Sequence, residues 1–275
     1  MTHVAPHTPH DMSLAYETVI SLARDSGLAA LPIINTGHTG RHGAYADAAA
    51  AQGFLTICTG GGNHRVHGQV APYGGARGML PTNPWCIGIP GGDLGPVVMD
   101  FATGRIAGGW IYAAQSAGAL LPEDCVIDRD GNPTRDPQAH FDGGAILPMG
   151  GHNGYSLSLM AELIGEAMLG PSSPECNWFL LAVDTRRFRQ PEALQAAAEE
   201  VLADLRNCPP APGFEKVEIP GERERVESVV TSILQHGWSA YERYTSPLGI
   251  GFVVAGGVAG GYCAPKGGPH FGPGP

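Results

Sequence analysis

The sequence is poor in lysine. Only Lys216 and Lys266 occur in 275 residues, and the formal net charge is −10. Nucleic-acid binding depends on clustered Lys and Arg side chains that neutralise phosphates, so this charge balance excludes that class of partner. Any anionic substrate or cofactor would have to be held by Arg, His, backbone N–H groups or helix N-termini.

Long apolar runs and paired cysteines are also absent. No stretch has the length and hydrophobicity of a membrane span or a signal peptide. The six cysteines are scattered, without a Cys-x-x-Cys pair. This usage predicts reduced thiols in the cytoplasm, no membrane partner and no cysteine-based metal site.

Glycine and proline are abundant, with 41 and 24 residues that separate apolar runs. Together with 43% hydrophobic residues, this composition predicts a loop-rich globular enzyme with a sizeable core. The Gly- and Pro-rich tail over 246–275 is the exception, and we predict that it is disordered.

Hydrophobic periodicity predicts an α/β chain in which helices and strands alternate irregularly. Residues 59–85 are too rich in Gly and Pro for regular structure. The run from Asp100 predicts a short helix with Thr103 at its beginning. Strands are expected over 29–34, 54–58, 86–89, 97–101 and 178–184, and the other helices over 11–27, 44–53, 154–169, 193–206 and 226–234.

The stretch 31–43, LPIINTGHTGRHG, places His38 in a glycine-rich loop directly after an apolar strand. Glycines on both sides expose this histidine instead of burying it. Since histidine exchanges a proton near neutral pH, His38 is the candidate catalytic acid/base. A histidine that merely hydrogen-bonds its own loop is the alternative that the sequence leaves open.

Two further patterns suggest other ligands. The spacings His38/His42 and His64/His67 raise the possibility of a metal hydrolase, but the glycines oppose the helix that would align two rings. We therefore predict no metal site. The runs at 60–62 and 74–75 are weak candidates for a phosphate cradle, and Gly150–Gly151 before a helix is better placed because the helix dipole attracts an anion.

Seven stretches, in this order, resemble the type-2 malate/L-lactate dehydrogenase family, which includes ureidoglycolate dehydrogenases, sulfolactate dehydrogenases and cyclic imino acid reductases. The matching stretches are NTGHTGRHGAYA (35–46), QVAPYGGARGMLPTNPW (69–85), VMDFATGRIA (98–107), LPEDCVIDRDGNPTRDP (121–137), ILPMGGHNGYSLSLMAELI (146–164), AVDTRRF (182–188) and IPGERER (219–225).

The resemblance implies a non-Rossmann NAD(P)-binding domain with a largely antiparallel sheet flanked by helices (α/β, α+β), plus a smaller helical part. We expect residues 61–189 to bind NAD or NADP, and residues 1–60 with 190–245 to form the substrate and dimerisation part of a homodimer. His38 matches the catalytic acid/base. The residues that match the family's cofactor-binding segments are Gly62, Thr82, Asn83, Pro84, Asp100, Phe101, Ala102, Thr103, His152, Asn153, Gly154, Pro220, Gly221 and Glu222.

This chain departs from the family pattern at three places. The family's Ser-His-Gly segment, which binds the substrate carboxylate, would lie upstream and has no counterpart here, so Arg41 is the substitute we consider. Asn153 and Gly109 occupy positions that are usually Lys, which weakens anion binding.

These observations predict an oxidoreductase that interconverts a small 2-hydroxy acid and its 2-oxo acid, or reduces a cyclic imino acid. The alternative is a shortened, non-catalytic protein that binds cofactor without turnover. The sequence leaves the substrate and the choice between NAD and NADP open.

Overall fold

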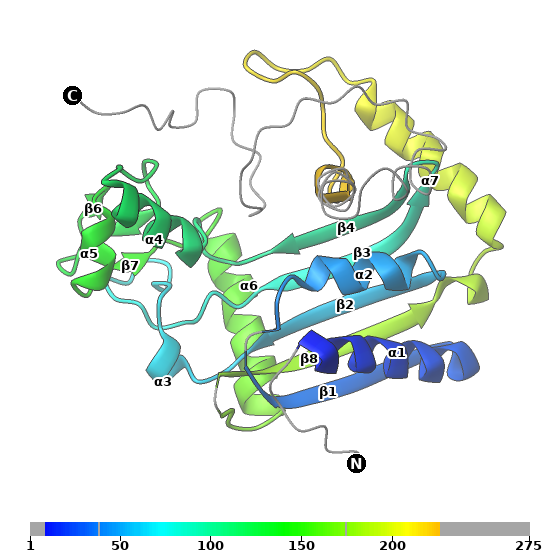
Figure 1. The fold of residues 1–275 in the computed structure, drawn as a ribbon, viewed down its shortest axis with the longest axis horizontal. Coiled ribbons are helices and arrows are strands. Elements are labelled where there is room, and N and C mark those ends of the chain that lie inside the picture. The colour runs from blue at the N-terminus through cyan, green and yellow to red at the C-terminus, as the bar shows by residue number, and fades with distance from the viewer. Residues whose placement is uncertain (1–8, 38, 174, 226–275) are drawn as a thin grey trace, which may run out of the picture.

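A computed structural model describes residues 9–37, 39–173 and 175–225 (Figure 1). The predicted acid/base His38, the helix predicted over 226–234 and the Gly- and Pro-rich tail lie outside the described residues.

The fold is built on a five-stranded sheet in which every neighbouring pair is antiparallel. The strand order is β1-β8-β2-β3-β4, so the late strand β8 lies between the first two strands of the chain. The antiparallel sheet that the family resemblance implied is therefore confirmed. The strands are β1 (Leu28–Thr36), β2 (Phe54–Gly61), β3 (Trp85–Gly92), β4 (Gly95–Phe101) and β8 (Cys176–Asp184).

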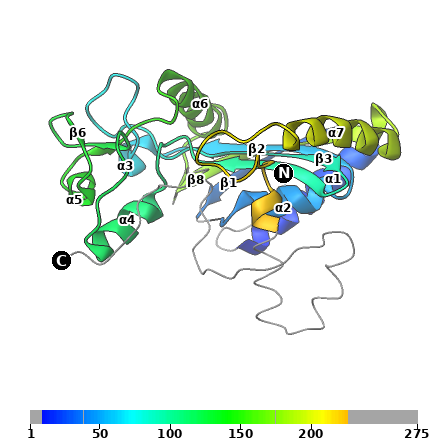
Figure 2. The ribbon, with the colours of Figure 1, turned by 90° about the horizontal axis from the view of Figure 1, so that it is seen from above.

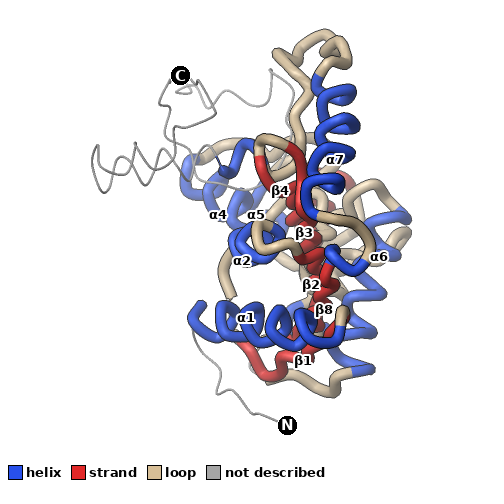
Figure 3. Tube along the Cα trace, turned by 90° about the vertical axis from the view of Figure 1, so that its right-hand side faces the viewer, coloured by secondary structure: helices blue, strands red, loops and turns tan. Residues whose placement is uncertain are grey.

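Helices cover both faces of this sheet (Figures 2 and 3). On one face lie α1 (Pro9–Ser26) and α2 (His42–Ala50). On the opposite face lie α7 (Pro191–Arg206) and α6 (His152–Glu162), which runs directly into a π-helical turn, η1 (Leu163–Met168). Within the described residues, no helix is both long and apolar enough to span a bilayer.

The face toward α1 and α2 holds the main apolar core. Strand residues that point to this face alternate along the chain, as the two-residue period of a strand requires. Phe54, Cys58, Cys86, Trp178 and Leu180 are all nearly inaccessible there, and they pack against α1 and α2 through Met12, Val19 and Ala46.

The face toward α6 and η1 is packed differently, with glycines and polar side chains. Gly165 of η1 lies against the backbone of Gly61 at the end of β2, where a Cβ on Gly165 would fall 2.5 Å from the Gly61 carbonyl carbon. The Asn177 amide donates to the Gly165 and Gly170 carbonyl oxygens at 3.0 and 2.7 Å. Hydrogen bonds thus replace apolar contacts at this end of the sheet.

A smaller lobe, shown in green in Figure 1, follows β4. Its apolar cluster includes Val70, Ile111 and Ile146. Its elements are α4 (Gly108–Ala117), β5 (Val126–Ile127), β6 (Pro133–Thr134), α5 (Pro137–Phe141) and β7 (Ala145–Ile146), and the loop between β2 and β3 reaches it through the short α3 (His64–His67).

Two element predictions need correction. The helix predicted with Thr103 at its beginning starts only at Gly108, because Thr103 donates both its N–H and its hydroxyl to the Thr82 carbonyl oxygen, at 2.8 and 2.9 Å. The first helix begins at Pro9 and not at Asp11. The remaining strand and helix predictions within the described residues are confirmed to within a few residues at their ends.

Candidate cofactor-binding site

The carboxylate of Glu162, at the end of α6, is the hub of the candidate site. It is 6% exposed and accepts three hydrogen bonds: from the Gly62 N–H at 3.0 Å, the His64 N–H at 3.2 Å and the Asn83 amide at 3.0 Å. Burial raises the pKa of Glu162. These contacts bring Gly62 and Asn83, two predicted cofactor residues, to the same side chain.

The segment Thr82–Trp85 is bonded to the sheet and to α6. Thr59 donates its hydroxyl to the Pro84 carbonyl oxygen at 3.0 Å, and the Trp85 indole N–H donates to the Leu157 carbonyl oxygen at 3.1 Å. Asn83, which adopts a positive φ of 31°, also donates to the Ser158 carbonyl oxygen at 2.9 Å. Two buried acceptors here, Asn83 Oδ1 and Ser158 Oγ, have no recorded hydrogen-bond partner.

Thr82, Thr103 and Gly154 are joined by a short relay of backbone bonds. Thr103 donates to Thr82, Met149 donates to Thr103 at 3.0 Å, and Gly154 donates to Met149 at 3.0 Å. Phe101 and Ala102, at the end of β4, lead into this relay. The structure therefore brings the segments 62, 82–84, 101–103 and 152–154 together around α6.

The N-terminus of α6 follows a pair of glycines. Gly150 and Gly151 have φ values of 56° and 63°, a conformation that favours glycine. None of the described side chains caps this helix, but the N–H groups of Asn153, Gly154 and Tyr155 donate to backbone carbonyl oxygens at 3.4, 3.0 and 3.2 Å. The N–H of the exposed His152 is therefore the candidate anion donor of the first turn. Tyr73 packs edge-on against His152, with ring centroids 5.9 Å apart.

Asp100 lies on the opposite face of the sheet from Glu162 and contacts the start of α2. Its carboxylate accepts the Gly43 N–H at 2.6 Å. Burial raises the pKa of Asp100, and the Gly43 hydrogen bond and the Arg41 guanidinium partly offset that rise. Arg41 is exposed and serves as the N-cap residue of α2, so this charge lies next to the loop that carries His38.

Pro220, Gly221 and Glu222 lie against β4. The Val98 N–H donates to the Pro220 carbonyl oxygen at 3.2 Å, and Glu222 pairs with Arg206 of α7 at 2.7 Å. Gly221 has a φ of 93°. The described contacts thus place this turn beside the strand that carries Asp100, apart from the group around α6.

The histidines of the metal-hydrolase alternative have separate surroundings. His42 is buried, with its ring 4.2 Å from that of Trp178 and its Nε2 3.0 Å from Thr39 Oγ1. His64 Nδ1 lies 2.6 Å from Glu166 Oε2 and 3.7 Å from Glu162 Oε1. The ligand atoms of His64, Glu162 and Glu166 lie within 4.8 Å of one another. The Glu162 carboxylate, however, already accepts three N–H donors of the protein.

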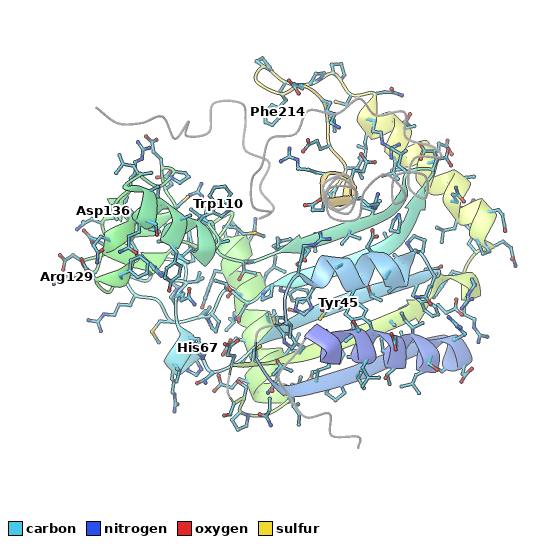
Figure 4. All side chains as sticks on the ribbon, in the orientation of Figure 1. Tyr45, His67, Trp110, Arg129, Asp136 and Phe214 are labelled. Atoms are coloured by element: carbon cyan, nitrogen blue, oxygen red, sulfur yellow. The ribbon has the colours of Figure 1, made fainter. Side chains whose placement is uncertain are left out.

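The hollow of about 490 Å³ on the small lobe does not suit a dinucleotide. Four of its six lining residues are aspartates, which would repel phosphates. In Figure 4, Arg129 and Asp136 mark this hollow, well separated from His67 and Tyr45. The lining residues are Asp128, Arg129, Asp130, Asp136, Ala139 and Asp142.

Sequence reasoning missed Glu162, Ser158 and Tyr73. Glu162 carried the clearest signal, because it is an acidic residue inside the run LSLMAELIG of a helix whose other residues are mostly apolar or small. A charge in such a setting is rarely buried without partners.

Comparison with known proteins agrees with the antiparallel sheet flanked by helices. The family model for malate/L-lactate dehydrogenase matches residues 8–232. The chain is 32% identical to L-lactate dehydrogenase of Cupriavidus necator over 257 residues, which covers 87% of this chain and 73% of that enzyme. It is 33% identical to L-sulfolactate dehydrogenase of Methanocaldococcus jannaschii, with 76% of this chain and 62% of that enzyme covered.

Solved structures show the same fold. Sulfolactate dehydrogenase of Methanocaldococcus jannaschii superposes with a TM-score of 0.69 at 28% identity, covering 86% of this chain and 71% of that one. Delta1-piperideine-2-carboxylate reductase of Pseudomonas syringae gives 0.70 at 29% identity, covering 84% and 71%. The chain belongs to the malate/L-lactate dehydrogenase family.

Proposed function

We propose that this chain is an NAD(P)-dependent oxidoreductase that interconverts a small 2-hydroxy acid and its 2-oxo acid, or reduces a cyclic imino acid. Family membership sets the class of reaction, and the relatives named above are lactate, sulfolactate and piperideine-carboxylate enzymes. The observation that carries the proposal for this chain is the gathering of four predicted cofactor segments around α6.

The described residues suit a dinucleotide. The uncapped first turn of α6 offers the His152 N–H for a phosphate, and Asn83 Oδ1 and Ser158 Oγ are buried polar atoms that lack a partner among the described residues. When bound, the nicotinamide cofactor supplies the hydride acceptor or donor. Thr82, Thr103 and Gly154 would then hold the neighbouring backbone in place.

His38 is the proposed acid/base. In the oxidative direction its imidazole accepts the proton of the substrate hydroxyl, and in the reductive direction it returns a proton to the carbonyl or imine. Arg41 is the nearest cation in the sequence, and we propose it as a partner for the substrate carboxylate. We further propose a cytoplasmic homodimer that uses no metal.

A cofactor-binding protein without turnover is the second candidate. The observation that favours it is the loss of cations, because Asn153 and Gly109 stand where the family usually has Lys. Cofactor binding by calorimetry combined with the absence of turnover would select this candidate.

The test is a spectrophotometric assay of the purified chain with a panel of 2-oxo acids and cyclic imino acids, with NADH and with NADPH. We expect turnover by wild type, and a decrease of about 10²- to 10⁴-fold in kcat for His38→Ala, the range that general acid–base catalysis contributes. His140→Gln, in the small lobe, is the matched control and should keep wild-type kcat. No oxidation of either cofactor above the blank, or equal rates for wild type and His38→Ala, would refute the catalytic proposal.

A further inference from the structure

We infer that Glu162 is a positioning residue for cofactor binding: its buried carboxylate fixes the loop 61–64 and Asn83 in the conformation that receives the dinucleotide. This inference rests on the proposed function. Glu162 itself touches no reacting atom in this account, and it acts through the backbone and amide groups that it holds.

The geometry shows one side chain tying together two segments that are distant in sequence. Oε2 accepts the Gly62 N–H and the Asn83 amide, each at 3.0 Å, and Oε1 accepts the His64 N–H at 3.2 Å. An ionised carboxylate has about four lone-pair sites and no proton to donate. Its two oxygens can therefore accept all three donors at once, which a glutamine amide cannot do because one of its two polar atoms is an NH₂ donor.

Gly61 shows how closely the carboxylate and the loop fit. A Cβ at this position would meet Glu162 Oε2 at 2.7 Å and Asn83 Oδ1 at 2.9 Å. The loop therefore approaches Glu162 as closely as bare backbone allows. Asn83 and Asn63 adopt positive φ values of 31° and 62°, so two residues near the carboxylate are held in a conformation that L side chains seldom adopt.

We expect this clamp to increase the affinity of the protein for its cofactor. A loop that is ordered before binding loses less conformational entropy when the ligand arrives, so preorganisation lowers the dissociation constant. The reacting groups do not change, and the rate at saturating cofactor should therefore stay near that of wild type.

The same cluster does not need a metal to be complete. Glu166 Oε2 is occupied by His64 Nδ1 at 2.6 Å, and Glu162 is occupied by its three donors. A divalent ion would have to displace the His64 proton and compete with backbone N–H groups. The described contacts thus favour a clamp made of protein groups alone.

The test compares Glu162→Gln with wild type in cofactor titration calorimetry and in steady-state kinetics. The substituted amide keeps the shape but turns an NH₂ group toward at least one N–H donor. Losing a charge-assisted hydrogen bond raises the dissociation constant by about tenfold or more, which corresponds to about 1.4 kcal/mol. We expect this rise in Kd and in KM for the cofactor, with kcat at saturating cofactor within about twofold of wild type.

Glu200→Gln, an exposed residue of α7, is the matched control and should leave Kd unchanged. A Kd for Glu162→Gln within twofold of wild type, or an equal loss of kcat and affinity, would overturn the inference. If wild type itself binds neither NADH nor NADPH, the proposed function fails; if wild type binds and Glu162→Gln binds equally well, only the clamp fails.

Two measurements on wild type keep the inference testable should Glu162→Gln not fold. Hydrogen–deuterium exchange should show that the Gly62 and His64 amides are protected before cofactor is added, and free exchange at both would overturn the clamp. Dialysis against a chelator should leave cofactor affinity unchanged. A loss of affinity that Mn²⁺ restores would show that the cluster is a metal site and overturn the clamp.

Discussion

The two faces of the central sheet differ in chemistry although the same strands build both. Toward α1 and α2, buried Phe, Trp, Leu and Cys side chains interdigitate. Toward α6 and η1, the buried groups are glycine backbone and the side chains of Asn83, Ser158, Glu162 and Asn177. One face is stabilised by removing apolar area from water, and the other by directed hydrogen bonds.

This difference separates the face that holds the main apolar core from the face for which we propose cofactor binding. A polar face requires each donor to find its acceptor, and Asn83 Oδ1 and Ser158 Oγ are buried atoms there that have no hydrogen-bond partner among the described residues. The apolar face holds such atoms as well, namely Tyr16 Oη and Trp178 Nε1. The residues predicted from family resemblance to bind cofactor gather mainly on the polar face.

The largest effect should come from adding one methyl group to the polar face. Gly165→Ala would bring a Cβ to 2.5 Å from the Gly61 carbonyl carbon, so η1 must move away from β2. We expect a loss of about 3 kcal/mol or more in the free energy of unfolding, measured by urea denaturation.

Gly109→Ala is the control for Gly165→Ala, because a Cβ there meets nothing within 4 Å on α4. It should gain about 0.5–1 kcal/mol from helix propensity. If both substitutions change stability equally, close packing between η1 and β2 is not what holds that face together.

A smaller, pH-dependent effect on the free energy of unfolding should come from Asp100, whose carboxylate lies on the apolar face. Its pKa is raised in the folded protein, chiefly by burial. Between its ordinary value, about 3.9, and that raised pKa, the folded state holds a proton that the unfolded chain has released. The contribution of Asp100 to the free energy of unfolding therefore falls as pH rises through this window, and it stays constant at higher pH.

Asp100→Asn removes this ionisation while leaving an oxygen for the Gly43 N–H. The free energy of unfolding of the variant should therefore increase relative to wild type as pH rises from about 4 to 7. This increase should be smaller than the loss caused by Gly165→Ala. Urea unfolding of both proteins across this range is the measurement. A difference that stays constant with pH would contradict the assignment.

The smallest expected effect concerns the anion-binding end of α6. Asn153→Lys adds a cation to the exposed first turn of α6, at a position where the family resemblance predicts Lys. One added charge on this exposed turn should lower the Kd for NADPH or NADH by about two- to fivefold at low salt, and by less at high salt. Asn207→Lys, exposed at the end of α7, should not change Kd, and equal effects of both variants would indicate nonspecific attraction.

The sequence predicted those features that depend on local pattern. Alternating apolar residues gave the strands, and the glycines before His152 gave the helix start, because both signals lie within a few residues. Family resemblance added the antiparallel pairing, which periodicity alone does not encode.

What could not be predicted depends on pairing between distant segments. Leu157, Met160 and Leu163 keep helical spacing, yet the buried side of α6 is formed by Gly154, Ser158, Ala161 and Glu162, while Met160 and Leu163 are about half exposed. The role of Glu162 depends on N–H donors at Gly62 and His64, which lie about a hundred residues away. No local pattern carries that information.

The joining of α6 and η1 into one unbroken rod has a mechanical consequence. The end at His152 carries the N–H proposed for a phosphate, and the last residue of α6 carries the carboxylate that gathers Gly62 and Asn83. A tilt of the rod would move both positions together. The cofactor contacts proposed near His152 and near Glu162 would therefore be gained or lost together. Substitutions at opposite ends of this rod are therefore expected to be energetically coupled despite their separation.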